Sequence, residues 1–109
     1  MAAEEDWPGG DFAVCKMTDE AGNTGLGEQF VWWPETGVSP NQIIIAIQEA
    51  LYKYVLGRIP FDYKDIRTHM NNNVARNETA KGLLDMAIRQ FAEQHSLITE
   101  LINNFSIYC

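Results

Sequence analysis

Two short runs near the N-terminus alternate apolar and polar residues in the manner of β-strands. The run "DFAVCKM" (11–17) places Phe12 and Val14 on one face, and "EQFVWW" (28–33) is rich in aromatic and β-branched residues. The stretch between them, "TDEAGNTGLG" (18–27), is dense in turn residues. The pattern predicts a β-hairpin over 12–33, preceded by a loose acidic N-terminus over 1–11. Within a strand, the adjacent Trp32 and Trp33 would point to opposite faces, one into the core and the other exposed or covered by a partner.

The period of the pattern changes from two to 3.6 after Pro34. Ser39, Pro40 and Gln42 have the spacing of a helix start with a capping box, and Gly57 suits the position just past a helix end. This segment predicts a helix over 39–57. Its apolar stripe consists of Ile44, Ile47, Leu51, Tyr54 and Val55.

A second helix is predicted over 77–105, after an exit and loop over 58–76 in which residues 61–69 can form a short helical turn. Asn77 can cap it, and His95 interrupts its apolar row. The apolar residues recur at seven-residue spacing: Leu84, Phe91, Ile98 and Phe105, with Ile88 and Ile102 in the adjacent row. Such a stripe packs against another helix, most simply helix 39–57 running antiparallel. We therefore predict one α+β domain over 1–109, an N-terminal β-hairpin followed by two long antiparallel helices.

The exit from the first helix, "LGRIPFDYKDIR" (56–67), is unusually apolar for a connecting segment. Gly57 stops the helix and Pro60 prevents its restart. Ile59, Phe61 and Tyr63 then either fill the bottom of the helix pair or contact a partner.

Charge is distributed unevenly along the chain, whose formal net charge is −7. Residues 1–40 carry eight acidic residues against Lys16 alone, whereas residues 41–109 are balanced. Without a basic stripe to displace phosphate counterions, binding to nucleic acid is not expected. No uninterrupted apolar run is long enough to cross a membrane, and no secretory signal is evident, so we expect an intracellular protein.

The residues that could carry chemistry do not form a recognisable motif. Cys15 and Cys109 lack zinc spacing, His69 and His95 are not spaced as a metal pair, and no phosphate-binding glycine motif is present. We therefore predict no catalytic residue, no metal and no cofactor, and a protein that is not an enzyme. The alternative is a nucleophile–base pair of Cys15 with a histidine.

The segment "FVWWPETGVSPNQIIIAIQEALYKYVLGRIPFDYKDIR" (30–67) resembles the opening of the comet family, the HORMA-like adaptors that bind the mitotic-arrest-deficient spindle-checkpoint protein. The matching positions are Phe30 and Val31 in a strand, 49–56 in a helix, and Arg58 to Ile66 in its exit. Asp62 stands where the family has a second proline. The chain also lacks two residues after the arginine and the later part of the family's domain.

This resemblance implies the N-terminal half of a HORMA-like domain. The implied function is a non-enzymatic adaptor that binds a HORMA checkpoint protein and promotes its remodelling by an AAA+ ATPase in mitosis, in the nucleus and cytoplasm. Tyr54, Arg58, Phe61 and Tyr63 are the protein-binding residues it implies. A small helical scaffold subunit that acts as a homo- or hetero-oligomer is the alternative, because a hairpin and two helices leave apolar surface uncovered.

Overall fold

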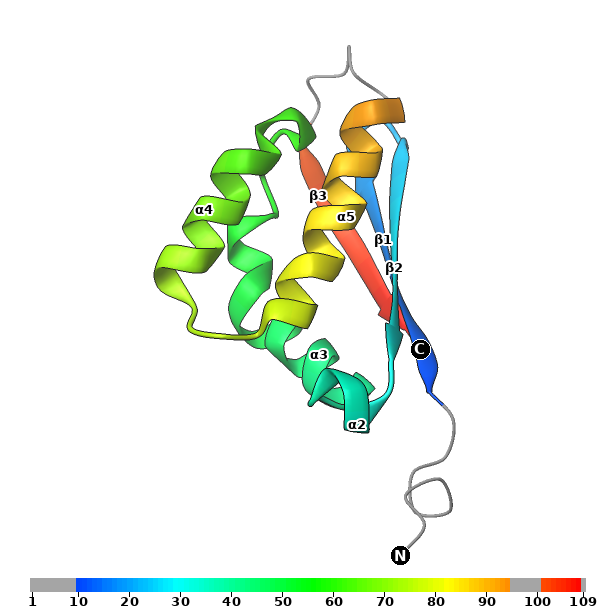
Figure 1. The fold of residues 1–109 in the computed structure, drawn as a ribbon. Coiled ribbons are helices and arrows are strands. Elements are labelled where there is room, and N and C mark those ends of the chain that lie inside the picture. Colours follow the sequence, from blue (N-terminus) through cyan, green and yellow to red (C-terminus); the bar gives the residue numbers. More distant parts are fainter. Residues whose placement is uncertain (1–9, 95–100, 109) are drawn as a thin grey trace, which may run out of the picture.

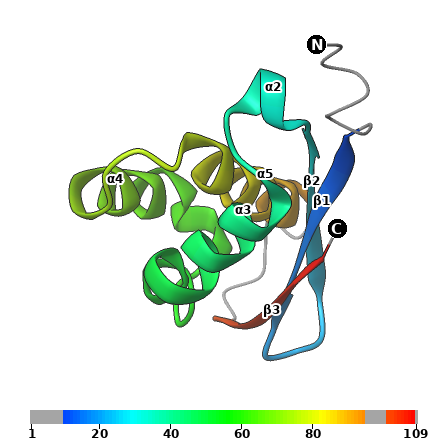
Figure 2. The ribbon, with the colours of Figure 1, turned by 90° about the horizontal axis from the view of Figure 1, so that it is seen from below.

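A computed structural model of the chain describes residues 10–94 and 101–108. Helices cover one face of a three-stranded antiparallel sheet, and the other face is left open (Figures 1 and 2). The elements in chain order are β1 (Asp11–Asp19), β2 (Thr24–Val31), α2 (Trp33–Thr36), α3 (Pro40–Ala46), the π-helix η1 (Ile47–Leu51), the 3₁₀-helices η2 (Tyr52–Tyr54) and η3 (Pro60–Asp62), α4 (Tyr63–Asn73), α5 (Glu78–Gln94) and β3 (Ile102–Tyr108). The sheet order is β2-β1-β3. The predicted α+β class is confirmed, whereas no feature of the described residues supports a HORMA-like fold.

The predicted N-terminal hairpin is present, with its second strand shifted toward the N-terminus. β1 pairs with β2 from Asp11 opposite Val31 to Thr18 opposite Thr24. Residues 24–27, which we had assigned to the loop, therefore belong to the strand. The tryptophans that we had placed in the strand lie beyond it, and Trp33 opens α2 instead.

The hairpin turn is organised by the side chain of Asp19. Its carboxylate accepts hydrogen bonds from the backbone N–H groups of Ala21 and Asn23, each at 2.9 Å, and from the Asn23 side-chain amide at 3.0 Å. The Asp19 side chain is thus buried with its oxygens satisfied by the turn it closes.

Two glycines let α5 lie directly on β2. A Cβ atom at Gly25 would lie 2.6 Å from the Phe91 Cβ, and one at Gly27 would lie 2.6 Å from the Leu83 carbonyl oxygen. These two inward positions of β2 must therefore lack side chains for the helix and strand backbones to approach this closely.

The predicted helix 39–57 exists as a continuous helical segment of changing pitch. The capping box is confirmed, because the Ser39 hydroxyl accepts a bond from the Gln42 N–H while the Gln42 side chain accepts one from the Ser39 N–H. The segment continues from α3 through the π-helix η1 to the 3₁₀-helix η2. Gly57 adopts a left-handed φ of 80°, as its place past the helix end requires.

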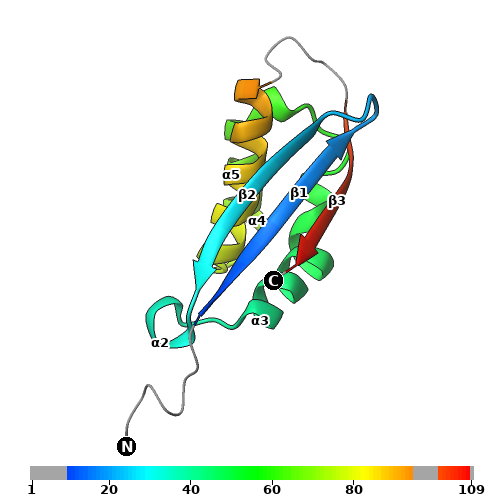
Figure 3. The ribbon, with the colours of Figure 1, turned by 90° about the vertical axis from the view of Figure 1, so that its right-hand side faces the viewer.

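The segment predicted as exit and loop (58–76), with a short helical turn over 61–69, contains the 11-residue helix α4. Figures 1 and 3 show that α4 runs antiparallel to α5, whereas the helical segment that begins with α3 runs in the same direction as α5. The predicted antiparallel pairing of helices 39–57 and 77–105 is therefore wrong, since α4 takes that place.

The prediction of one helix over 77–105 is also wrong in its last part. α5 is described to Gln94, and residues 102–108 form β3, which pairs antiparallel with β1 from Val14 opposite Tyr108 to Asp19 opposite Ile102. Ile98 and His95 lie outside the described residues. Phe105 and Ile102, which had been assigned to the helical stripe, instead belong to the sheet.

A single apolar core lies between the sheet and the helices. β1 contributes Ala13, Cys15 and Met17, all fully buried. The helices contribute Ile43, Ile47, Leu51, Ile66, Met70, Leu83, Leu84, Ala87, Ile88 and Phe91. No helix within the described ranges is long and apolar enough to cross a membrane.

Candidate functional site

The four residues that the sequence singled out for partner binding lie along the turn between η2 and α4. Tyr54 ends η2 half-buried, with the Lys53 ammonium 5.4 Å from its ring centroid. Arg58 is half-buried in the turn, and its carbonyl accepts a hydrogen bond from the Ile102 N–H at 2.9 Å. The backbone at Arg58 therefore joins the exit segment to β3.

The two aromatic residues of this group differ in exposure. Phe61, in η3, is 64% exposed and lines a shallow depression of about 370 Å³. Tyr63 begins α4 half-buried, and the Arg89 guanidinium lies 4.7 Å from its ring centroid. Tyr63 thus has a partner inside the domain, and Phe61 is the member of the group that offers a free apolar surface. Its contact with a partner stays a prediction.

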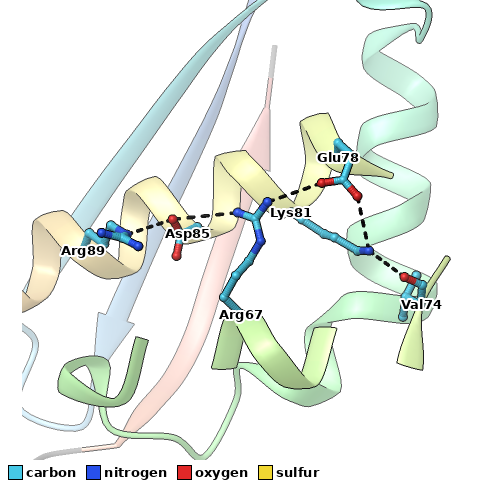
Figure 4. A network of polar contacts seen from close by, with 6 residues as sticks. All are labelled: Arg67, Val74, Glu78, Lys81, Asp85 and Arg89. Carbon is cyan, nitrogen blue, oxygen red and sulfur yellow. Dashed lines mark hydrogen bonds and ion pairs between the residues drawn. The ribbon is translucent and has the colours of Figure 1, made fainter. Parts of the chain in front are cut away.

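The densest cluster of charged side chains joins α4 to α5 (Figure 4). Arg67 of α4 reaches Glu78 at 3.4 Å and Asp85 at 3.8 Å, and Arg89 contacts the same Asp85 oxygen at 2.8 Å. Lys81 is 2% exposed, and its ammonium donates to the Val74 carbonyl at 2.5 Å and lies 3.7 Å from Glu78. The charges in this cluster therefore hold the two helices and the loop between them together.

Two buried groups that might serve as nucleophile or acid, Cys15 and Asp19, are committed to the fold. Burial raises the pKa of the Cys15 thiol to about 12, so this residue stays protonated and unreactive at neutral pH. Burial by itself would raise the pKa of Asp19. The hydrogen bonds from Asn23, Ala21 and Gly22 lower this pKa by more than burial raises it, so it lies below its ordinary value of 3.8. Within residues 10–94 and 101–108, no three His, Cys, Asp or Glu residues are grouped to hold a metal ion.

The open face of the sheet carries an exposed apolar surface, which we call the outer sheet face. Figure 3 shows this face, with the helices behind it. Phe12 and Phe30 lie on paired positions of β1 and β2 with ring centroids 5.5 Å apart, in an edge-to-face arrangement. They are 53% and 38% exposed, and Leu26 on the same face is 44% exposed. An aromatic pair of this kind on an uncovered sheet is typical of a surface that another domain or subunit covers.

The fold and this surface define a class of protein: an α+β domain with helices on one face of its sheet and exposed apolar residues on the other. Residues 9–98 match the family described as "Mandelate racemase / muconate lactonizing enzyme, N-terminal domain". The match covers most of the chain, so the protein belongs to this family. Comparisons with curated proteins and with solved structures find no match.

The family overturns three predictions made from the sequence. The resemblance to the comet adaptors is wrong, because the exit segment on which it rested lies inside the matched residues 9–98. The function inferred from that resemblance is therefore also wrong, namely a mitotic checkpoint adaptor that binds a HORMA protein and promotes its remodelling by an AAA+ ATPase. The prediction that the protein is not an enzyme is also wrong, because the family is a domain of an enzyme superfamily.

Sequence reasoning missed the outer sheet face because it misplaced β2. With Gly25 and Gly27 assigned to a loop, Leu26 was not assigned to the face that carries Phe12 and Phe30. The run "TGLGEQFV" (24–31) does alternate small or inward residues with Leu26, Glu28 and Phe30. That alternation was the available signal.

Proposed function

We propose that this chain serves as the N-terminal domain of an enzyme that makes or breaks a C–H bond next to a carboxylate. The observation that carries the proposal is the family match over residues 9–98. Mandelate and muconate, the substrates in the family's name, are both organic acids. Racemisation of mandelate breaks the bond between hydrogen and the carbon that bears the carboxylate. Lactone formation from muconate places a hydrogen on a carbon next to a carboxylate.

Within that enzyme, we propose that the domain docks on the catalytic part through the outer sheet face. The paired rings of Phe12 and Phe30 supply the apolar part of this surface. Leu26 lies further along β2, beyond the exposed Glu28 and opposite the exposed Lys16. Aromatic anchors with polar groups beside them match the usual anatomy of protein interfaces. The polar side chains described above, Asp19 in the hairpin turn and Lys81 with the ion pairs between α4 and α5, stabilise the domain itself. A domain that uses these groups for its own structure suits a role in docking.

The reaction class is tested with the protein as its gene encodes it, in deuterated water, with and without divalent cations. The substrates are mandelate, muconate and related 2-hydroxy and dicarboxylic acids, and the product is followed by NMR. We expect deuterium to enter at the carbon next to a carboxylate of at least one acid. If no acid of the panel exchanges above the rate without protein, the proposed reaction class is wrong.

The docking surface is tested in the same assay with two lysine variants at equally exposed positions. Phe12, on the sheet, and Ile45, on α3, are each 53% exposed. Phe12→Lys should lower kcat/KM by roughly tenfold or more because it replaces one ring of the aromatic pair in the proposed interface with a charge. Ile45→Lys should leave kcat/KM unchanged within about twofold. Equal effects of the two variants would show that docking uses another surface.

A further inference from the structure

The two edges of the sheet are covered to different extents. At the β2 edge, side chains of α5 cap the backbone: the Leu26 N–H donates to the Gln90 side-chain oxygen, and the Glu28 N–H contacts the Met86 sulfur at 3.3 Å. These contacts occupy donors that would otherwise be open to another strand. The β2 edge is therefore protected by the domain itself.

The β3 edge is covered at its first residue. Ile102 donates its N–H to the Arg58 carbonyl at 2.9 Å, and its carbonyl accepts the Gly57 N–H at 2.7 Å. Among the described residues, backbone hydrogen bonds from outside the sheet reach β3 at Ile102 alone. Phe105 and Ile107 pack against the core but stay half-buried, as expected where no further element of the described chain lies beyond the strand. Figure 3 shows β3 as the edge opposite β2.

The sequence of β3 lacks the usual protection of an edge strand. The strand "INNFSIY" (102–108) contains no charged residue and no proline, in a chain with net charge −7. Two copies can therefore approach along β3 without opposing like charges. Antiparallel pairing of two identical strands also satisfies two-fold symmetry, the commonest symmetry of homodimers. β3 lies beyond the residues that match the family.

We propose that β3 is a dimerisation strand that pairs antiparallel with β3 of a second copy of this chain. The pairing joins two three-stranded sheets into one continuous sheet. It supplies hydrogen-bond partners along the edge after Ile102 and covers the half-buried Phe105 and Ile107 side chains. The two outer sheet faces then lie side by side on one face of the dimer, away from the helices.

The test measures the oligomeric state of the full chain by sedimentation velocity from micromolar to submillimolar concentration. We expect a reversible dimer for the wild type. The double variant Asn104→Lys with Ser106→Lys should weaken dimerisation by roughly tenfold or more, because both side chains are exposed and like charges then face each other across the two-fold axis. Mixing this lysine variant with a second double variant, Asn104→Glu with Ser106→Glu, should restore dimerisation in the form of a heterodimer of the two variants.

The matched control carries Asn71→Lys with Asn72→Lys, which changes net charge by the same amount at exposed positions of α4, away from the sheet. It should dimerise like the wild type. Hydrogen exchange of wild-type β3 amides should slow as concentration rises, which needs no variant to fold. The proposal would be overturned if the wild type stays monomeric or if the lysine variant dimerises normally. It would also be overturned if the mixture of lysine and glutamate variants does not associate, or if hydrogen exchange of β3 does not depend on concentration.

Discussion

The contact between α5 and β2 makes Gly27→Ala the sharpest test of the fold. The added methyl carbon would lie 2.6 Å from the Leu83 carbonyl oxygen and 2.9 Å from the Ala87 nitrogen. Both atoms belong to the backbone of α5, so no side-chain rotation can relieve the overlap. Because ordinary contact requires about 3.5 Å or more, the helix must move away from the strand by several tenths of an ångström.

That movement disturbs a fully buried part of the core. α5 presents Leu83, Leu84, Ile88 and Phe91, all fully buried, to the sheet and to the other helices. Overpacking of this kind costs about 1–3 kcal/mol, whereas the loss of glycine flexibility in the unfolded chain returns about 0.4–1 kcal/mol. We therefore expect Gly27→Ala to lower the free energy of unfolding by about 1–2 kcal/mol.

Urea denaturation followed by circular dichroism measures this change, and Gly82→Ala is the matched control. Gly82 lies within α5, and no atom lies within 4 Å of the position that its Cβ would take. Alanine there should raise the free energy of unfolding by about 0.5–1 kcal/mol through helix propensity alone. A Gly27→Ala protein as stable as the wild type would refute the close approach of α5 to β2.

Three further predictions concern the buried polar groups. Lys81→Met should lower the free energy of unfolding by about 1–3 kcal/mol in urea titrations because the Val74 carbonyl loses its donor; an unchanged value would contradict the role of the ammonium. Because the folded pKa of Asp19 lies below its ordinary value of 3.8, its stabilisation is complete above that value and is lost as pH falls through the folded pKa. Thermal melts at decreasing pH should therefore show a loss of stability in acid that is smaller in Asp19→Asn, and parallel curves would disprove it. With Cys109 changed to Ser, Cys15 should react with a maleimide at neutral pH only as fast as the domain opens, since burial raises its pKa to about 12; rapid labelling without urea would show an open core.

Local features of the fold could be predicted from the sequence because they depend on neighbouring residues. The capping box at Ser39 and Gln42 and the left-handed Gly57 each involve a few adjacent residues. The first strand was also predicted, because its alternation is local. Each of these elements was found where the sequence placed it.

Features set by distant contacts could not be predicted in this way. Ile102 and Phe105 fit a seven-residue helical spacing, but β3 forms because β1, at the other end of the chain, offers it an edge. Gly25 and Gly27 suggested a turn because glycine usually serves there, and only the presence of α5 explains them in a strand.

The candidate site was harder to predict than the fold. The exit residues drew attention because an apolar connection is unusual, yet Tyr63 is held under Arg89 within the domain. The outer sheet face required the correct strand register, which a shift of four residues in the start of β2 had obscured. The exit segment also proved too short to separate one family from another.

The sheet order has a consequence for synthesis of the chain on the ribosome. β1, the central strand, is made first, its neighbour β2 follows at once, and its other neighbour β3 is made last. The hairpin and the helices that pack on it can therefore assemble while one side of β1 still waits for residues 102–108. Through that interval β1 is paired on one side only, and its other side is an open strand edge of the kind that makes folding intermediates prone to aggregation.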